Sequence, residues 1–188
     1  MNWLKRSTRR EPSTEWAEFT TRLTRTIRDL DDRVFLIISD EASGAYVQFA
    51  ADMERVSAEC VDNQSGALKT KIDQAGEVRL LELGWSMYSV SEPNWKTSLG
   101  LPATTAQARH IANMCVAALR EIFNVSSPDQ LAYAAWRDPE PAWPDWMYEE
   151  LETAGDDDDE YGEKLSPPDP GENPLLLPQL GLKAEERA

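Results

Sequence analysis

The sequence predicts an α+β domain followed by an acidic tail, and three observations lead to this class. Apolar residues recur at steps of three or four in the first segment, which predicts an amphipathic helix that starts near residue 13. Three strand-like segments come after it in close succession. The regular patterns stop near residue 137, where proline and aspartate become frequent. The apolar face of the first helix consists of Trp16, Phe19, Leu23, Ile27 and Leu30.

The three strand-like segments span residues 34–38, 45–51 and 56–61. The first is an aliphatic run, and the other two alternate apolar and polar side chains, as half-buried strands do. Because only short links separate them, we expect an antiparallel meander. One face is apolar enough to receive the first helix. The other face is mixed, with Tyr46, Gln48, Ser57 and Glu59 as its expected members.

The second half of the domain is expected to supply further helices that pack on one face of the sheet. Asp73 begins a helix that ends at Gly84, a residue suited to the left-handed position after a helix. The alternation of Trp95, Thr97 and Leu99 predicts a further short strand. A long helix then starts near Thr105, and a short last helix, residues 127–136, is expected to bury Leu131 and Ala134.

Charge and proline content place the domain boundary. We expect a flexible arm over residues 1–12, the domain over 13–136 and a disordered tail over 137–188. The tail holds sixteen acidic and four basic residues, which accounts for most of the net charge of −15. Such a segment cannot bury enough apolar surface to offset the entropy of ordering it. Two apolar islands interrupt it, one at Trp143 and Trp146 and one formed by Leu175, Leu176, Leu177 and Leu180.

The composition argues against several classes of function. A net charge of −15 opposes binding to nucleic acid or to anionic membranes. The first twelve residues lack the apolar core of a secretory signal, so we expect a cytoplasmic protein. Cys60 and Cys115 are expected to be buried thiols, although a disulfide between them stays open. His110 is the only histidine, and no zinc motif or glycine-rich phosphate loop is present. We therefore expect no cofactor, no metal and no catalysis.

Seven tryptophans are the most informative single residue type. Trp85 and Trp95 lie near irregular segments, where aromatic side chains either line a peptide groove or complete a small core. Trp143 and Trp146 lie in the tail, where they either dock on the domain or capture a partner. The sequence leaves both alternatives open.

Four segments resemble the TY-Chap domains, relatives of type III secretion chaperones and YbjN-like proteins. They are Tyr46-Val-Gln-Phe-Ala50, Ala58-Glu-Cys-Val-Asp-Asn63, Leu80-Leu-Glu-Leu-Gly-Trp85 and Asn94-Trp95. The resemblance covers about residues 16–125 and leaves the tail outside. It implies a fold with a helix, a three-stranded meander and further helices, and it implies peptide binding without catalysis. The chain departs from the family after Asn63, where it reads Gln-Ser-Gly-Ala-Leu68, so its groove is expected to differ there.

The sequence supports three hypotheses about function. The leading one is a chaperone-like adaptor that binds a protein or peptide partner and that forms a homodimer or joins a larger assembly. Its groove residues would be Tyr46, Gln48, Glu59, Trp85, Asn94 and Trp95. In the second hypothesis, the tail regulates the protein by placing residues 143–148 or 175–180 in the same groove. The third hypothesis is a hydrolytic enzyme that uses Glu59 or His110.

Overall fold

The computed structural model describes residues 12–87, 93–144 and 166–185. One six-stranded sheet forms the centre of the fold, with the order β4-β3-β2-β1-β5-β6. All pairings are antiparallel except the one between β5 and β6. The strands are β1 (Val34–Asp40), β2 (Ala45–Ala51), β3 (Arg55–Cys60), β4 (Trp95–Gly100), β5 (Ala132–Arg137) and β6 (Lys183–Ala184). The predicted meander and the further short strand are both confirmed.

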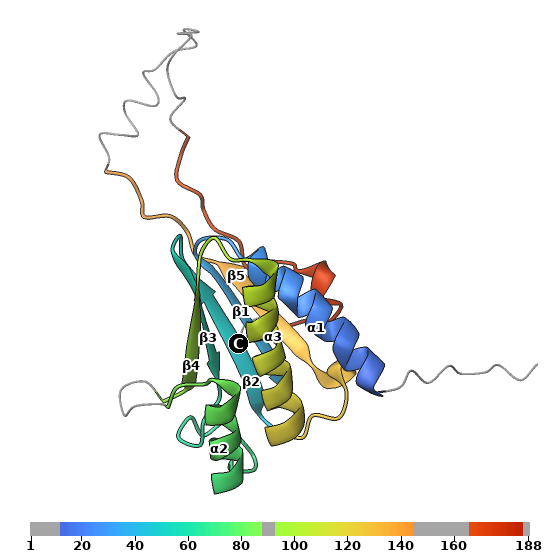
Figure 1. Ribbon diagram of the computed structural model, residues 1–188. Coiled ribbons are helices and arrows are strands. Elements are labelled where there is room, and N and C mark those ends of the chain that lie inside the picture. The colour runs from blue at the N-terminus through green and yellow to red at the C-terminus, as the bar shows by residue number, and fades with distance from the viewer. Residues whose placement is uncertain (1–11, 88–92, 145–165, 186–188) are drawn as a thin grey trace, which may run out of the picture.

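Two helices, α1 (Pro12–Arg28) and α3 (Thr105–Ala117), lie side by side on one face of the sheet (Figure 1). The apolar stripe predicted for the first helix forms part of the core beneath them, with Phe19, Leu23 and Ile27 fully buried. The strand residues that meet these helices are also buried, among them Leu36, Ile38, Val47, Phe49 and Val56. We call this side the covered face.

Local signals explain where the helices begin and end. The helix α2 (Gln74–Leu83) is capped by the Asp73 carboxylate, which accepts a hydrogen bond from Gly76 N at 2.8 Å, and it ends at Gly84 with φ of 101°. The helix α3 starts with a reciprocal capping box between Thr104 and Gln107, so the cap lies one residue before the expected Thr105. It continues into a π-helical turn, η1 (Ala118–Ile122). The first helix begins at Pro12, one residue earlier than expected.

The expected last helix over residues 127–136 is wrong. Only a 3-10 turn, η2 (Pro128–Gln130), forms there, and the chain then runs as strand β5 beside β1. Leu131 is buried as expected. Alanine favours helix in isolation, but the backbone pairing with β1 overrides that weak preference in this position. The pairing also places Trp136 opposite Phe35, where their rings stack.

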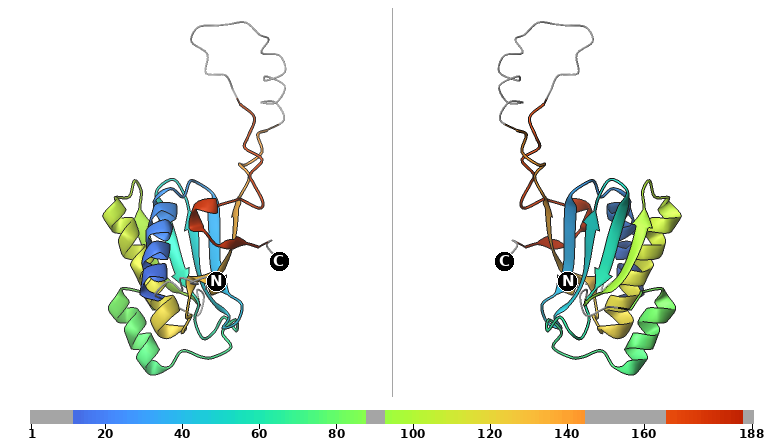
Figure 2. Two further views of the ribbon diagram at one scale, coloured as in Figure 1. Left: turned by 90° about the vertical axis from the view of Figure 1, so that its right-hand side faces the viewer. Right: turned by 90° about the vertical axis from the view of Figure 1, so that its left-hand side faces the viewer.

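The disorder expected for the tail does not hold for residues 166–185. From Glu172 on, this segment lies against the outer edge of β5 and against α1, while Asp169 pairs with Glu140 beyond the end of β5 (Figures 1 and 2). It includes a 3-10 turn, η3 (Pro178–Leu180), and Leu180 is completely buried in the domain core. Leu180, three further leucines that pack on the core and several backbone hydrogen bonds to β5 hold this segment, even though the composition of the whole tail opposes folding; the three are Leu175, Leu177 and Leu182.

None of the helices in the described part of the chain combines the length and the apolar composition needed to cross a membrane.

Candidate functional site

The second face of the sheet is the candidate site, because no described helix covers it (Figure 1). Its side chains alternate with those of the covered face, and most are half-buried where their covered neighbours are fully buried. We call this side the open face. The register of the strands places thirteen residues on it: Phe35, Ile37, Ser39, Tyr46, Gln48, Ala50, Ser57, Glu59, Lys96, Ser98, Ala132, Ala134 and Trp136.

A polar network occupies the half of the open face formed by β2, β3 and β4. The Tyr46 hydroxyl donates a hydrogen bond to Asn94 Oδ1 at 3.1 Å, and Asn94 Nδ2 donates to Glu59 Oε2 at 2.9 Å. Gln48 Nε2 donates to the same carboxylate oxygen at 2.8 Å. Lys96 Nζ lies 3.7 Å from Glu59 Oε1. The Glu59 carboxylate is therefore the shared acceptor of three donors that come from three different strands or loops.

The two ends of this network differ in solvent exposure. Asn94 is only 8% exposed, whereas the Glu59 and Lys96 side chains are 27% and 32% exposed. Burial raises the pKa of the Tyr46 hydroxyl, and the nearby Glu59 and Asp62 carboxylates raise it further. Tyr46 therefore stays a neutral donor at physiological pH. The network therefore leaves the Glu59 carboxylate partly exposed to solvent, and the Asn94 and Gln48 side-chain amides fix its position by hydrogen bonds.

An apolar half lies beside this network, on β1 and β5. The rings of Phe35 and Trp136 stack with their centroids 5.1 Å apart and their planes within 7° of parallel. Ile37 and Ala134 continue this apolar half along the same two strands, and both are half-buried. Side by side, the two halves make a surface on which one ligand can bury apolar groups and also pair its polar groups.

A shallow depression of about 440 Å³ marks the polar half of the open face. It lies over β3 and β4 and reaches Ser86, whose backbone forms a bridge with that of Lys96. The lining residues are Arg55, Ser57, Ala58, Glu59, Ser86, Lys96, Thr97 and Ser98. The depression therefore adjoins the network through Glu59 and Lys96.

The structure brings together four of the six residues expected in the groove, namely Tyr46, Gln48, Glu59 and Asn94. It places Trp85 and Trp95 in the core instead, at 2% and 1% exposure. The alternation of β4 explains Trp95, which pairs with the buried Cys60. Lys96, Phe35 and Trp136 were missed as site residues. Lys96 and Phe35 could have been predicted to lie on the open face. Side chains alternate between the two faces of a strand, and each of these residues is adjacent to a residue of the covered face.

The leucines named in the second apolar island lie at the β5 edge and against the domain core, away from the polar network of the open face. Leu175 and Leu177 are half-buried against the domain core, and Leu176 is 63% exposed. Trp143 is half-buried, and Trp146 lies outside the described residues. The described part of the second apolar island binds the β5 edge instead.

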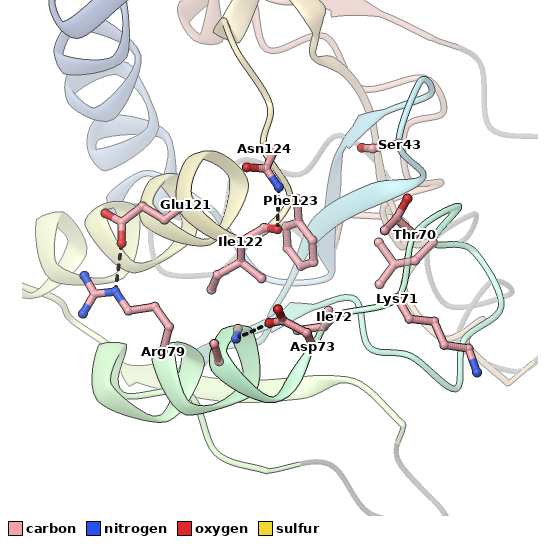
Figure 3. Close-up of a pocket in the computed structure, with 13 residues that line it drawn as sticks. Ser43, Thr70, Lys71, Ile72, Asp73, Arg79, Glu121, Ile122, Phe123 and Asn124 are labelled. Carbon is pink, nitrogen blue, oxygen red and sulfur yellow. Dashed lines mark hydrogen bonds and ion pairs between the residues drawn. The ribbon is translucent and has the colours of Figure 1, made fainter.

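A second and larger cavity, of about 710 Å³, lies between the start of α2 and the end of η1 (Figure 3). Ile122 and Phe123 provide apolar walls, and the Arg79 guanidinium makes an ion pair with Glu121 at 2.8 Å. The Asp73 carboxylate is engaged in capping α2. The Arg79, Glu121 and Asp73 side chains, which Figure 3 draws near α2, are thus engaged within the protein.

The histidine, the cysteines and the carboxylates that could serve catalysis or metal binding do not gather at one place in the described residues. Within residues 12–87, 93–144 and 166–185, no group of three or more His, Cys, Asp or Glu side chains is placed to hold a metal ion. His110 is exposed on α3, on the opposite side of the sheet from Glu59. Cys60 and Cys115 are buried free thiols, and burial raises the pKa of each. Neither thiol is therefore poised to act as a nucleophile.

Comparison with known families gives one match. The model of the TY-Chap3 family, described as T3SS (YopN, CesT) and YbjN peptide-binding chaperone 3, matches residues 9–137. This range contains β1 to β5 and the described helices α1, α2 and α3, and it ends at the last residue of β5. Searches of curated proteins and of solved structures each found no match.

Proposed function

The chain belongs to the TY-Chap3 family of peptide-binding chaperones, and we propose that it binds an extended client peptide on the open face of its sheet. The observation that carries this proposal is the pairing of two unlike halves on one uncovered surface. The half-buried Phe35, stacked on the largely buried Trp136, and Ile37 supply apolar contact area, and the network around Glu59 supplies fixed polar groups.

Each half has a distinct role in the proposed complex. Aromatic and aliphatic side chains of the client would pack on Phe35, Ile37 and Ala134, because apolar area drives most peptide association. The client backbone would donate hydrogen bonds to Glu59, whose position is set by Asn94 and Gln48 before the client arrives. A preorganised acceptor costs little entropy on binding. The proposed role is therefore capture of unfolded segments, without catalysis.

Further expectations from the sequence accompany this proposal. The partner would be a protein or peptide, not a nucleic acid or a membrane, because the chain carries a net charge of −15. We also propose a cytoplasmic location, no cofactor and a homodimer as the working form. Sedimentation of the full chain measures the last of these directly.

A peptide selection tests the proposed function. A displayed library of random peptides is selected on the full-length chain, and the affinity of the best peptide is measured by fluorescence anisotropy. We expect Glu59→Gln to weaken that peptide at least tenfold, on the order of 1.4 kcal/mol, because the charged acceptor is lost. His110→Ala, on the exposed surface of α3, is the matched control and should bind as the original chain does. A selected peptide whose affinity is unchanged by substitutions at both Glu59 and Phe35 would contradict the proposal.

A further inference from the structure

The outer edge of β5 is occupied by a segment of the same chain. We define the strap as residues 169–185. Glu172 and Arg137 exchange two backbone hydrogen bonds, at 2.8 and 3.0 Å. Leu175 N then donates to Ala135 O at 2.8 Å, and Glu185 N donates to Tyr133 O at 2.8 Å. The strap thus runs beside β5 along its length, first antiparallel and then, at β6, parallel.

The strap is held at two points: an arginine pair, Arg33 and Arg137, contacts its first residue, and a leucine socket, the site where Leu180 is buried against α1, holds its turn. Leu180 is completely buried beside α1, within the turn that joins the antiparallel and parallel parts. At the start of the strap, Asp169 lies 3.0 Å from Arg33 Nη2 and 3.6 Å from Arg137 Nη1. A hydrogen bond from Gly171 N and these two guanidinium groups lower the pKa of the Asp169 carboxyl. The edge therefore recognises an acidic residue, an extended backbone and a leucine in that order.

The strap is attached by few contacts compared with the strands that it joins. Among its described residues only Leu180 is fully buried, both residues of β6 are exposed, and Leu176 is 63% exposed. Segments with little buried apolar area open locally, without unfolding of the whole domain. When the strap leaves, β5 presents an unpaired edge, and such edges pair with other extended chains.

From this arrangement we propose that the β5 edge and its leucine socket form a second peptide-binding site, which the strap occupies in cis. The partner is an extended peptide with an acidic residue and, about eleven positions later, a leucine, as in the strap itself. This site is separate from the open face. Because a tethered segment acts at an effective concentration of about millimolar, a free peptide binds weakly until the strap is released.

The test uses the full chain and a fluorescent peptide with the sequence of residues 169–185 as the probe. We expect Leu180→Asp, which expels the strap from its socket, to bind the probe at least tenfold more tightly than the original chain. Leu176→Asp is the matched control, because that leucine is exposed, and it should leave probe binding unchanged. A probe that itself carries Leu180→Asp should not bind either chain. A Leu180→Asp chain that keeps its circular dichroism spectrum but does not bind the probe would overturn the proposal.

Hydrogen exchange on the unaltered chain tests the same proposal without a substitution. The amides of Leu175, Leu177 and Glu185 should exchange at least a hundredfold faster than the amide of Leu36 in the central strand. Equal protection of both sets would mean that the strap opens only with the whole domain, which would also overturn the proposal. Because Glu59→Gln leaves the β5 edge intact, failure of the open-face site and failure of this site are separable.

Discussion

The two faces of the sheet are built from the same strands, and they differ in the burial of the alternate side chains along each strand. On the covered face, Leu36, Val47 and Val56 are fully buried under α1 and α3. On the open face, their neighbours Ile37, Gln48 and Ser57 are half-buried and meet no described helix. The covered face holds the buried core of the domain, and the open face is where we propose that the client peptide binds. Substitutions at adjacent positions should therefore have unlike effects.

The largest expected difference is in stability. Leu36→Ala should lower the free energy of unfolding by about 3 kcal/mol, because it removes buried methyl groups and leaves a cavity. Ile37→Ala, one position along the same strand, should cost about 1 kcal/mol, since its side chain is already partly in water. Urea unfolding monitored by tryptophan fluorescence measures both. Equal losses for the two variants would show that the open face is covered in solution.

A smaller effect is expected in thiol reactivity. Cys60 and Cys115 are buried and their pKa values are raised, so both should react slowly with a thiol reagent at neutral pH and rapidly after unfolding in urea. Ser57→Cys places a thiol on the open face of β3, three positions before Cys60. We expect one fast-reacting thiol in this variant and none in the original chain. Slow reaction at position 57 would count against an accessible open face.

The smallest expected effect concerns Tyr46. Its pKa is raised in the folded chain, so above about pH 10 the unfolded state loses the tyrosine proton more readily than the folded state does. The stability that Tyr46 contributes should therefore be present below pH 10 and decline as the pH rises towards the folded pKa. Unfolding measured between pH 9 and pH 11 should show a shallower decline for Tyr46→Phe than for the original chain. Identical slopes of the unfolding free energy against pH for the two chains would mean that the pKa of Tyr46 is not raised in the folded state.

Much of this architecture was predictable because it rests on local periodicity. The stripe from Trp16 to Ile27 and the alternation along β2 and β3 indicate which side chains face inward, whatever the topology. The α2 boundaries were equally local, set by Asp73 and Gly84. The open face was predictable from the same alternation, which is why Tyr46, Gln48 and Glu59 were found together.

Features that depend on distant partners were not predictable in this way. Residues 132–137 become a strand only because β1 offers an edge for them to pair with. Leu180 becomes a core residue only because α1 and β5 leave a socket that no local pattern reveals. From the sequence alone, Trp85 and Trp95 could line a groove or belong to the core. In the structure, where α3 packs over β4, both are core residues.

By itself, the sequence determined the fold class, the covered and open faces of the central strands and the resemblance to a peptide-binding family. These features arise from side-chain period and from short motifs, which the neighbouring residues specify. Only the tertiary structure decided that Glu59 collects donors from three segments, that β5 is a strand and that part of the acidic tail joins the sheet. The physical reason is that contacts between distant segments depend on which edges and sockets remain free once the local elements have packed.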